Sequence, residues 1–283
     1  MCGDVPTLLA RLGVMKPLII SGGGLARSGV AEELAHRGMP VVQFDGFTPN
    51  PTAEQVQAGL AMFRANECDG LLSIGGGSAI DVAKAVKALG GTDEQATLLS
   101  RLTQPAPMAV PHVALPTTAG TGSESTHFAT IYIGGKKYSV SHDALLPEAA
   151  ILDPAQLATL PDAERAATFL DALCHSIESY WSRRATDESR RYAAQAIGLL
   201  SANTQAYLHG DEAAASAVMA ASNFAGRAIN LTTTTAAHAM CYQLTALYGL
   251  RHGHAAAVCL PAAWEQLLSA GAEDAALQAR LTE

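Results

Sequence analysis

The stretch GLLSIGGGSAIDVAKAV, residues 70–86, decides how the first half of this chain folds. Its apolar start, residues 70–74, predicts a buried strand that runs directly into Gly75-Gly76-Gly77-Ser78. Residues 79–89 then carry apolar side chains at helical spacing. A strand, a glycine loop and a helix in this order place backbone amides at a helix N-terminus, where the helix dipole favours a phosphate group. A plain glycine-rich turn is the competing interpretation, because the pattern is neither GxGxxG nor a Walker A loop.

The same alternation of strands and helices extends to both sides of this stretch. Short apolar runs predict strands at 17–21, 40–44 and 112–115, and amphipathic runs predict helices at 26–37 and 53–66. Because the strands are nearly all apolar, we expect a parallel sheet that is covered on both faces. Residues 128–133 and 136–140 flank Gly134-Gly135, a pair that predicts a two-residue hairpin.

The texture of the sequence changes after residues 154–161. From Asp162 onward the chain is rich in alanine, and residues 163–181, 188–208 and 212–231 are each predicted to be helical. We therefore predict an α/β, Rossmann-like domain over residues 1–160 and an all-helical domain over residues 161–283.

The composition limits the classes of protein to which the chain can belong. Its 283 residues suggest about two domains, and 18 basic against 26 acidic residues give a net charge of −8. This acidic balance argues against nucleic-acid binding, since no basic stripe is available to neutralise phosphates. No apolar run approaches the roughly 18 residues of a membrane span, and the N-terminus does not resemble a signal peptide. The five cysteines form no CxxC pair, so we expect reduced thiols and a cytoplasmic protein.

A second candidate nucleotide loop, PTTAGTGSE, follows the strand at 112–115. It concentrates the hydroxyls of Thr117, Thr118 and Thr121 with two glycines, and such groups suit a ribose or a pyrophosphate. Two phosphate-type loops at the ends of parallel strands favour a dinucleotide site. Asp45, just past the second strand, could accept hydrogen bonds from an adenosine ribose and repel a 2′-phosphate. An ordinary turn residue is the alternative for Asp45, and ordinary first-turn and surface residues are the alternatives for Asp81 and Lys84.

The helical half contains a candidate metal site. Asp171 and His175 are separated by four positions, so on a helix they share one face. His238 and His252 complete a set of one carboxylate and three imidazoles, which suits Fe²⁺, Zn²⁺ or a similar divalent ion. Each of these residues alone has an ordinary structural interpretation. The prediction of a metal site depends on finding the whole set together with the two nucleotide loops.

Together these segments resemble the iron-dependent (group III) alcohol dehydrogenase family. The matching stretches span the whole chain in the family's order: FDGFTPNPT (44–52), GGGSAIDVAKAV (75–86), PTTAGTGSE (116–124), LDP (152–154), DALCHSIESY (171–180), HAMCYQLTALYGLRHG (238–253) and AVCLP (257–261). The resemblance implies an NAD-binding α/β domain, a helical metal-binding domain and a catalytic cleft between them. In the family, helices continue well beyond the segment that matches 238–261, so the resemblance also implies that this chain is C-terminally shortened.

The resemblance implies roles for individual residues. The pyrophosphate would be held by Gly75, Gly76, Gly77 and Ser78, with Asp81 in the same motif. The cofactor would further contact Thr117, Thr118, Thr121 and Lys137, and Asp45 matches the position that favours NAD over NADP. The metal ligands would be Asp171, His175, His238 and His252. The metal would act as a Lewis acid on the oxygen of the reacting carbonyl or alcohol during hydride transfer.

One departure from the family concerns proton transfer. Many members have a histidine four residues after the third ligand, where this chain has Tyr242. A phenol with a pKa of ~10 is a poorer base at neutral pH than an imidazole near ~6.5, but it can donate a proton to an alkoxide. We therefore take Tyr242 and the ligand His252 as the catalytic candidates, and we expect aldehyde reduction to be the favoured direction.

Within the family, residues 126–128, 136–140 and 228–235 resemble the phosphonoacetaldehyde reductases. A dianionic substrate end requires cationic or donor groups, and His127, Arg251 and His254 are the candidates. A strand cap is the alternative for His127, and surface positions are the alternatives for Arg251 and His254.

Other functions stay open at this point. A generic short-chain alcohol or diol dehydrogenase, an NAD-binding protein without catalysis and a cyclase resembling 3-dehydroquinate synthase would share these features. We expect Fe²⁺ rather than Zn²⁺, and a homodimer or larger homo-oligomer, as is common in the family.

Overall fold

The computed structural model describes residues 4–270 and 278–279, and the chain divides into two compact units. The first unit contains residues up to 117 together with residues 123–156, and the second contains residues 118–122 together with those from 157 onward. Among the described residues, no helix combines the length and apolar character that a membrane crossing requires.

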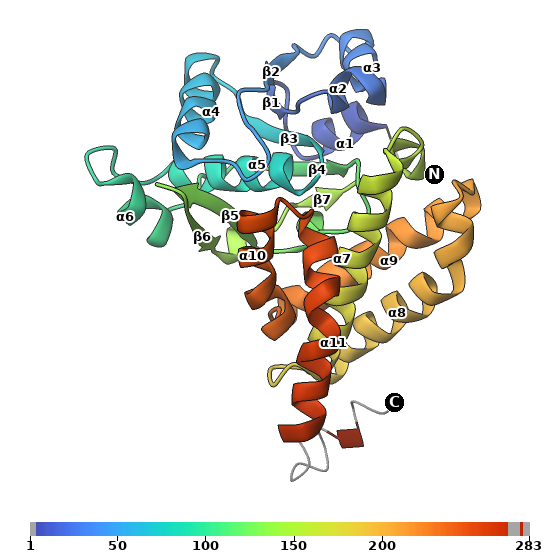
Figure 1. The fold of residues 1–283 in the computed structure, drawn as a ribbon. Coiled ribbons are helices and arrows are strands. Elements are labelled where there is room, and N and C mark those ends of the chain that lie inside the picture. Colours follow the sequence, from blue (N-terminus) through green and yellow to red (C-terminus); the bar gives the residue numbers. More distant parts are fainter. Residues whose placement is uncertain (1–3, 271–277, 280–283) are drawn as a thin grey trace. The chain divides into compact units, whose positions relative to one another are not determined.

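The first unit is built on a parallel sheet, as predicted (Figure 1). The strand order is β2-β1-β3-β4-β7, and every neighbouring pair is parallel. The strands are β1 (Pro17–Ile20), β2 (Val42–Phe44), β3 (Gly70–Gly75), β4 (His112–Pro116) and β7 (Ala149–Ala150). The register pairs Gly75 with Pro116, so the two predicted nucleotide loops leave the sheet at adjacent strand ends.

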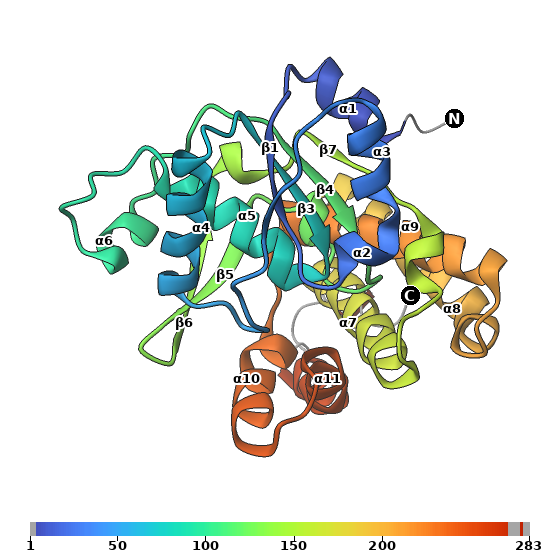
Figure 2. The same cartoon turned by 90° about the horizontal axis from the view of Figure 1, so that it is seen from above.

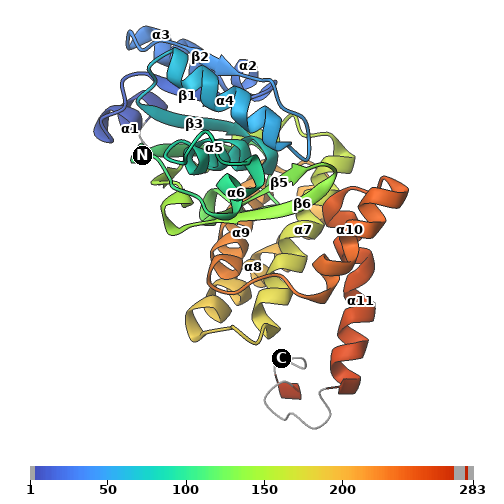
Figure 3. The same cartoon turned by 90° about the vertical axis from the view of Figure 1, so that its left-hand side faces the viewer.

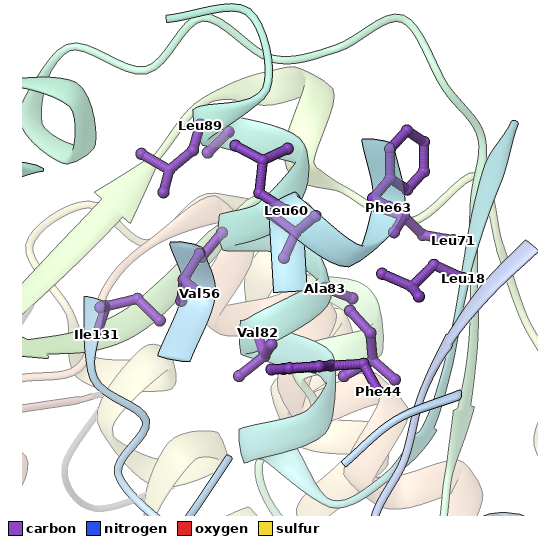
Figure 4. Close-up of a cluster of buried hydrophobic side chains, with 14 of the residues drawn as sticks. Leu18, Phe44, Val56, Leu60, Phe63, Leu71, Val82, Ala83, Leu89 and Ile131 are labelled. Carbon is purple, nitrogen blue, oxygen red and sulfur yellow. The ribbon is translucent and has the colours of Figure 1, made fainter. Parts of the chain in front are cut away.

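Helices cover both faces of this sheet (Figure 2). Leu18, Ile20 and Leu71 point to one face, where they pack against α4 (Ala53–Ala65) and α5 (Gly77–Leu89). Figure 4 shows this cluster, in which Leu60 and Val82 meet the strand side chains. The intervening strand residues pack on the other face against α1 (Val5–Arg11), α2 (Gly24–Ser28) and α3 (Val30–His36). Because both faces are buried, the strands carry apolar side chains at nearly every position.

The single helix predicted over residues 26–37 is wrong in one respect. Gly29 adopts a left-handed conformation with φ +73°, which ends α2 and begins α3. Glycine reaches this conformation without the steric cost that a Cβ atom brings. The helix predicted over 79–89 begins two residues earlier, at Gly77, so Ser78 belongs to its first turn.

The rest of the first unit lies after α5. Helix α6 spans Leu98–Thr103, and the predicted hairpin forms from β5 (Phe128–Ile133) and β6 (Lys136–Ser141). Gly134 and Gly135 turn the hairpin with φ values of +54° and +78°, as its two-residue loop requires. Short 3-10 turns cover Ser123–Ser125 (η1), Asp143–Leu145 (η2) and Pro154–Leu157 (η3).

The second unit contains the helices α7 (Asp162–Trp181), α8 (Asp187–Leu208), α9 (Glu212–Leu231), α10 (Ala236–Tyr248) and α11 (His252–Ala270). Helix α7 packs against α8, α9 and α11, and α10 packs against α11 (Figure 3). Thr186 and Asp211 cap α8 and α9 by accepting backbone hydrogen bonds. The core around α10 and α11 uses small residues such as Cys174, Ala237 and Ala256, which let these helices approach closely.

Candidate metal centre and nucleotide loops

Three helices bring the four predicted metal ligands together. Asp171 and His175 lie one turn apart on α7, His238 lies in the first turn of α10, and His252 is the first residue of α11. The Nε2 atoms of His175, His238 and His252 lie 3.9, 3.4 and 3.8 Å from Asp171 Oδ1. Asp171, His175 and His238 are buried, and the His252 side chain is 40% exposed. Three imidazole nitrogens from three helices thus lie within 4 Å of one carboxylate oxygen.

The spacing of these atoms suits a divalent metal ion. Bonds of about 2.0–2.1 Å in a tetrahedral site place neighbouring ligand atoms roughly 3.4 Å apart. The three nitrogen-to-oxygen distances lie at or slightly above that value, and the ligand atoms of Asp171, His238 and His252 all lie within 4.8 Å of one another. One carboxylate and three imidazoles also match the donors that Fe²⁺ and Zn²⁺ accept. The residues therefore fit the metal.

Two glycines let the backbone come close enough to build this centre. A Cβ atom on Gly253 would lie 2.6 Å from Cβ of Asp171 and would overlap the carbonyl oxygen of Ala167, so α11 approaches α7 at the residue next to His252. A Cβ atom on Gly120 would lie 2.7 Å from the carbonyl oxygen of Thr168. Side chains at either position would push the ligand-bearing segments apart.

The Nδ1 atom of each imidazole faces a partner away from Asp171. Nδ1 of His175 lies 3.4 Å from the carbonyl oxygen of Gly120, and Nδ1 of His252 lies 3.6 Å from Sγ of Cys241. Nδ1 of His238 is hydrogen-bonded to Glu178 Oε2. Sequence reasoning missed Glu178. Its position seven residues after Asp171, on the same helix face, is the signal that could have revealed it.

The electrostatics of the cluster favour positive charge at His238. Burial acts against ionisation of Asp171, but the neighbouring His175, His252 and His238 hold the pKa of Asp171 well below its usual range. Burial lowers the pKa of His175 to about 4, with Asp171 acting in the opposite direction. Burial also opposes charge on His238, yet its hydrogen bonds to Asp171 and Glu178 raise the pKa to about 9. The two buried carboxylates thus create a place for a cation.

The glycine loop lies at the end of β3. Gly75 is the last residue of the strand, Gly76 is the N-cap of α5, and Gly77 and Ser78 form its first turn. A glycine N-cap has no side chain with which to cap the helix amides, so these remain accessible to a phosphate. The backbone amide of Thr117 donates to the Gly75 carbonyl at 3.0 Å, which joins the start of the second loop to the first. Thr118 and Thr121 lie further along the second loop and belong to the second compact unit, which contains the helices α7 to α11.

The remaining cofactor candidates, Asp45, Lys137 and Asp81, differ in their exposure and in their hydrogen bonds. Asp45 is exposed directly after β2, and Lys137 lies partly buried on β6, opposite Tyr132. Asp81 uses both oxygens within the protein, accepting from Ser123 Oγ at 2.7 Å and from the Thr130 amide at 2.9 Å. Burial raises its pKa, although the nearby Lys84 opposes the shift.

Lys84 is fully buried, so the alternative of a surface residue is wrong for it. Its ammonium donates to four oxygens: Ser123 O, Ser123 Oγ, Thr126 Oγ1 and Phe128 O. These bonds tie α5 to the segment that follows the second loop.

Three of the candidate substrate and proton-transfer residues, His127, Arg251 and Tyr242, contact other side chains. The His127 ring packs edge-to-face on Phe128, with centroids 5.7 Å apart, and His254 is exposed on α11. Nε of Arg251 lies 2.5 Å from Oε1 of Glu164, and both side chains are about half exposed. The Tyr242 ring stacks on His252 at 5.7 Å with an interplanar angle of 11°. The structure thus brings Tyr242 to the metal cluster.

Comparisons with known proteins identify relatives that match most of the chain. Residues 2–154 match the iron-containing alcohol dehydrogenase family, and residues 165–280 match the C-terminal region of the Fe-containing alcohol dehydrogenase family. The NAD-dependent methanol dehydrogenase of Bacillus methanolicus is 35% identical over 91% of this chain and 70% of its own length. The phosphonoacetaldehyde reductase of Streptomyces viridochromogenes is 41% identical over 78% of this chain and 58% of its own length.

A solved structure extends the similarity to three dimensions. The sulfoacetaldehyde reductase of Bifidobacterium kashiwanohense, crystallised in complex with NAD⁺, superposes with a TM-score of 0.86 at 30% identity. The superposition covers 93% of this chain and 72% of the reductase. The chain therefore spans between 58% and 72% of these three relatives.

Proposed function

The chain belongs to the iron-containing alcohol dehydrogenase family, and from this premise we propose that it reduces an aldehyde to an alcohol with NADH and a divalent metal ion. The observation that supports the proposal most strongly is the convergence of three imidazole nitrogens on the buried Asp171 carboxylate. The glycine N-cap of α5 adds a place for the phosphates of a dinucleotide.

The proposed metal ligands are Asp171, His175, His238 and His252. Fe²⁺ is the proposed ion, with Zn²⁺ as the alternative that the same donors accept. When bound, the ion supplies Lewis-acid chemistry that stabilises negative charge on a carbonyl or alkoxide oxygen. The buried positions of Asp171, His175 and His238 limit competition from water and strengthen the electrostatic interaction.

The proposed cofactor site combines the two loops. The amides of Gly75, Gly76, Gly77 and Ser78 would bind the pyrophosphate, and Thr117, Thr118, Thr121 and Lys137 would contact the remainder, with Asp81 bracing the loop. The exposed carboxylate of Asp45 would accept hydrogen bonds from the adenosine ribose and repel the 2′-phosphate of NADP. We therefore propose NAD as the preferred cofactor.

We propose Tyr242 as the proton donor. Its ring stacks on the proposed ligand His252, and a phenol with a pKa of ~10 remains protonated at neutral pH. It can give that proton to an alkoxide as the carbonyl carbon is reduced. Aldehyde reduction is accordingly the proposed direction.

Phosphonoacetaldehyde is the proposed substrate, and 2-hydroxyethylphosphonate the product. Two of the three relatives described above are named for aldehydes that carry an acid group. His127, Arg251 and His254 are the proposed contacts for the phosphonate, and Arg251 would exchange Glu164 for the substrate. A generic short-chain alcohol or diol dehydrogenase is the second candidate, because the methanol dehydrogenase relative aligns with 91% of this chain.

A comparison of aldehydes tests the proposal. The measurement is kcat/KM from NADH absorbance loss, with Fe²⁺ or Zn²⁺, for phosphonoacetaldehyde, sulfoacetaldehyde and butyraldehyde. A clear preference for phosphonoacetaldehyde supports the proposed substrate, and equal values for all three eliminate it in favour of the generic dehydrogenase. No NADH loss with any aldehyde and either metal favours an NAD-binding protein without catalysis.

A further inference from the structure

Glu178 contacts the proposed metal ligand His238 and is not among the residues to which the family resemblance gives a role. It lies on α7, its side chain is fully buried, and its two oxygens have different partners. Oε1 accepts hydrogen bonds from the Thr235 amide (2.9 Å), the Thr235 hydroxyl (2.6 Å) and the Ala237 amide (3.0 Å), at the start of α10. Oε2 is hydrogen-bonded to Nδ1 of His238. One carboxylate thus holds both the N-terminus of α10 and the imidazole that α10 carries.

We propose that Glu178 is the positioning residue that sets the tautomer and ring orientation of His238, an inference that rests on the metal centre of the proposed function. An ionised carboxylate can only accept hydrogen bonds, so the proton of the neutral imidazole must lie on Nδ1. With a metal ion bound between Nε2 and Asp171, the lone pair of the neutral imidazole lies on Nε2 and is directed at the metal. Hydrogen bonding of this kind orients a metal-ligating histidine and raises its basicity.

The partners of the other two imidazoles are weaker. Nδ1 of His175 faces the neutral carbonyl of Gly120 at 3.4 Å, and Nδ1 of His252 faces the thiol of Cys241 at 3.6 Å. Hydrogen bonds to a charged acceptor are roughly twice as strong as those between neutral groups. Among these three contacts, the one between Glu178 and His238 therefore has the largest expected influence on metal binding.

The two tasks of Glu178 can be separated by substitution. In Glu178→Gln, the amide oxygen can still accept from the start of α10, but an NH₂ group replaces Oε2 and donates to Nδ1 of His238. This places the imidazole proton on Nε2 and blocks its lone pair. The matched control is Thr235→Val, which removes a donor to Oε1 and the acceptor of the Trp181 Nε1–H group, but neither partner of the contact between Oε2 and His238.

The test is a titration of the full chain with Co²⁺, followed by visible absorbance, for the wild type, Glu178→Gln, Thr235→Val and Asp171→Asn. We expect Glu178→Gln to weaken Co²⁺ binding by about 10- to 100-fold. Its metal-free melting temperature should also fall, because the neutral amide cannot replace the buried carboxylate that pairs with His238. Thr235→Val should lower the melting temperature and bind Co²⁺ like the wild type.

Each alternative outcome has a distinct meaning. If Asp171→Asn fails to bind Co²⁺ and Glu178→Gln binds like the wild type, the role of Glu178 is overturned and the metal centre stands. If Asp171→Asn also binds like the wild type, the metal centre itself is wrong. Equal weakening in Glu178→Gln and Thr235→Val would show that Glu178 acts only by holding α10, and it would overturn the inference.

A second measurement does not depend on a variant that folds. In ¹⁵N-histidine spectra of the Zn²⁺-loaded wild type, His238 should bind the metal through Nε2 and carry its proton on Nδ1. Coordination through Nδ1 would overturn the inference directly.

Discussion

The chain buries a cluster of charged side chains in each of its two units, and the clusters differ in where their positive charge comes from. In the α/β unit, the Lys84 ammonium donates to four oxygens of the chain. The Asp81 carboxylate accepts from one of these, Ser123 Oγ, and from the Thr130 amide. In the helical unit, the carboxylates of Asp171 and Glu178 lie beside the imidazoles. The Nε2 atoms of all three imidazoles face the same oxygen, Oδ1 of Asp171.

The two clusters differ in whether their hydrogen-bonding groups are satisfied by the protein alone. The lysine cluster supplies its own cation and directs its donors to acceptors, so it is complete without a ligand and acts on stability. The histidine cluster directs three Nε2 atoms at one carboxylate oxygen, an arrangement that a divalent ion completes. Buried charges without compensation are costly. We call the histidine cluster the open cluster, because a bound ion would complete it, and it indicates a functional site. We call the lysine cluster the closed cluster, because its own residues complete it, and it indicates a structural role.

Removing the carboxylate at the centre of the open cluster should have the largest effect. In Asp171→Asn, the anionic ligand is lost and an amide NH₂ faces the imidazoles. Because metal catalysis of this type contributes several kcal/mol, we expect kcat/KM for aldehyde reduction to fall by at least ~10³-fold. NADH fluorescence should show that cofactor binding persists. If the activity of Asp171→Asn stayed within tenfold of the wild-type activity, the histidine cluster would have no catalytic role that distinguishes it from the lysine cluster.

Replacing the cation of the closed cluster should affect stability and leave metal binding unchanged. Lys84→Met leaves oxygens of Ser123, Thr126 and Phe128 without their donor, and a buried polar group that loses its partner costs about 1–3 kcal/mol. Urea unfolding of the metal-free protein measures this loss, and a Co²⁺ titration checks that the affinity is retained. Lys87→Met is the matched control one turn further along α5, since its partner Glu148 is 38% exposed and the expected loss is smaller. Equal losses in the two variants would contradict the assignment.

Tyr242→Phe tests whether the open cluster extends to a proton donor. The substitution keeps the ring that stacks on His252 and removes the hydroxyl. Loss of a general acid costs typically at least ~10²-fold, so we expect a fall of that size in the reductive kcat, with Co²⁺ affinity unchanged. A reductive rate equal to the wild-type rate would mean that Tyr242 is not the donor.

The smallest expected effect concerns the buried histidine of the α/β unit. Burial, together with Lys84 and Lys87, holds the pKa of His112 well below 6.5. Below about pH 6.5 the unfolded chain therefore binds a proton that the folded chain excludes, and the free energy of unfolding falls as the pH falls. This contribution reaches at most about 1.4 kcal/mol per pH unit.

His112→Gln should remove that part of the pH dependence while an amide can still reach Ser73, the hydrogen-bond partner of His112. Urea unfolding of both proteins between about pH 5 and pH 7 measures the difference in slope. Parallel pH profiles for the wild type and the variant would contradict the prediction.

Local patterns of the sequence predicted most of the α/β unit. Apolar runs indicated β1, β3 and β4, because a strand buried on both faces carries apolar residues at nearly every position. Strand β7 has two residues, too few for any periodic pattern. The break at Gly29 was missed because a single glycine is compatible with a helical pattern until the left-handed conformation is seen.

The site was predictable to the extent that its residues lie close together in the sequence or match the family. Asp171 and His175 share a helix turn, whereas the role of Glu178 depends on Thr235 and His238, which are 57 and 60 positions away. The sequence could not exclude the surface alternative for Lys84 for the same reason, because its acceptors are 39 to 44 residues further along the chain. Lysine is almost never fully buried unless it is paired, and pairing at such separation requires the three-dimensional structure.

The close approach of Gly253 to α7 limits how this protein can be redesigned. A library that varies residues 251–254 to change substrate choice has two usable positions, because His252 carries a proposed ligand atom and position 253 has no space for a Cβ atom. Arg251 and His254 are exposed on either side of this pair. Diversity belongs at these two positions, and a library that randomised all four would consist mostly of proteins whose helices no longer meet.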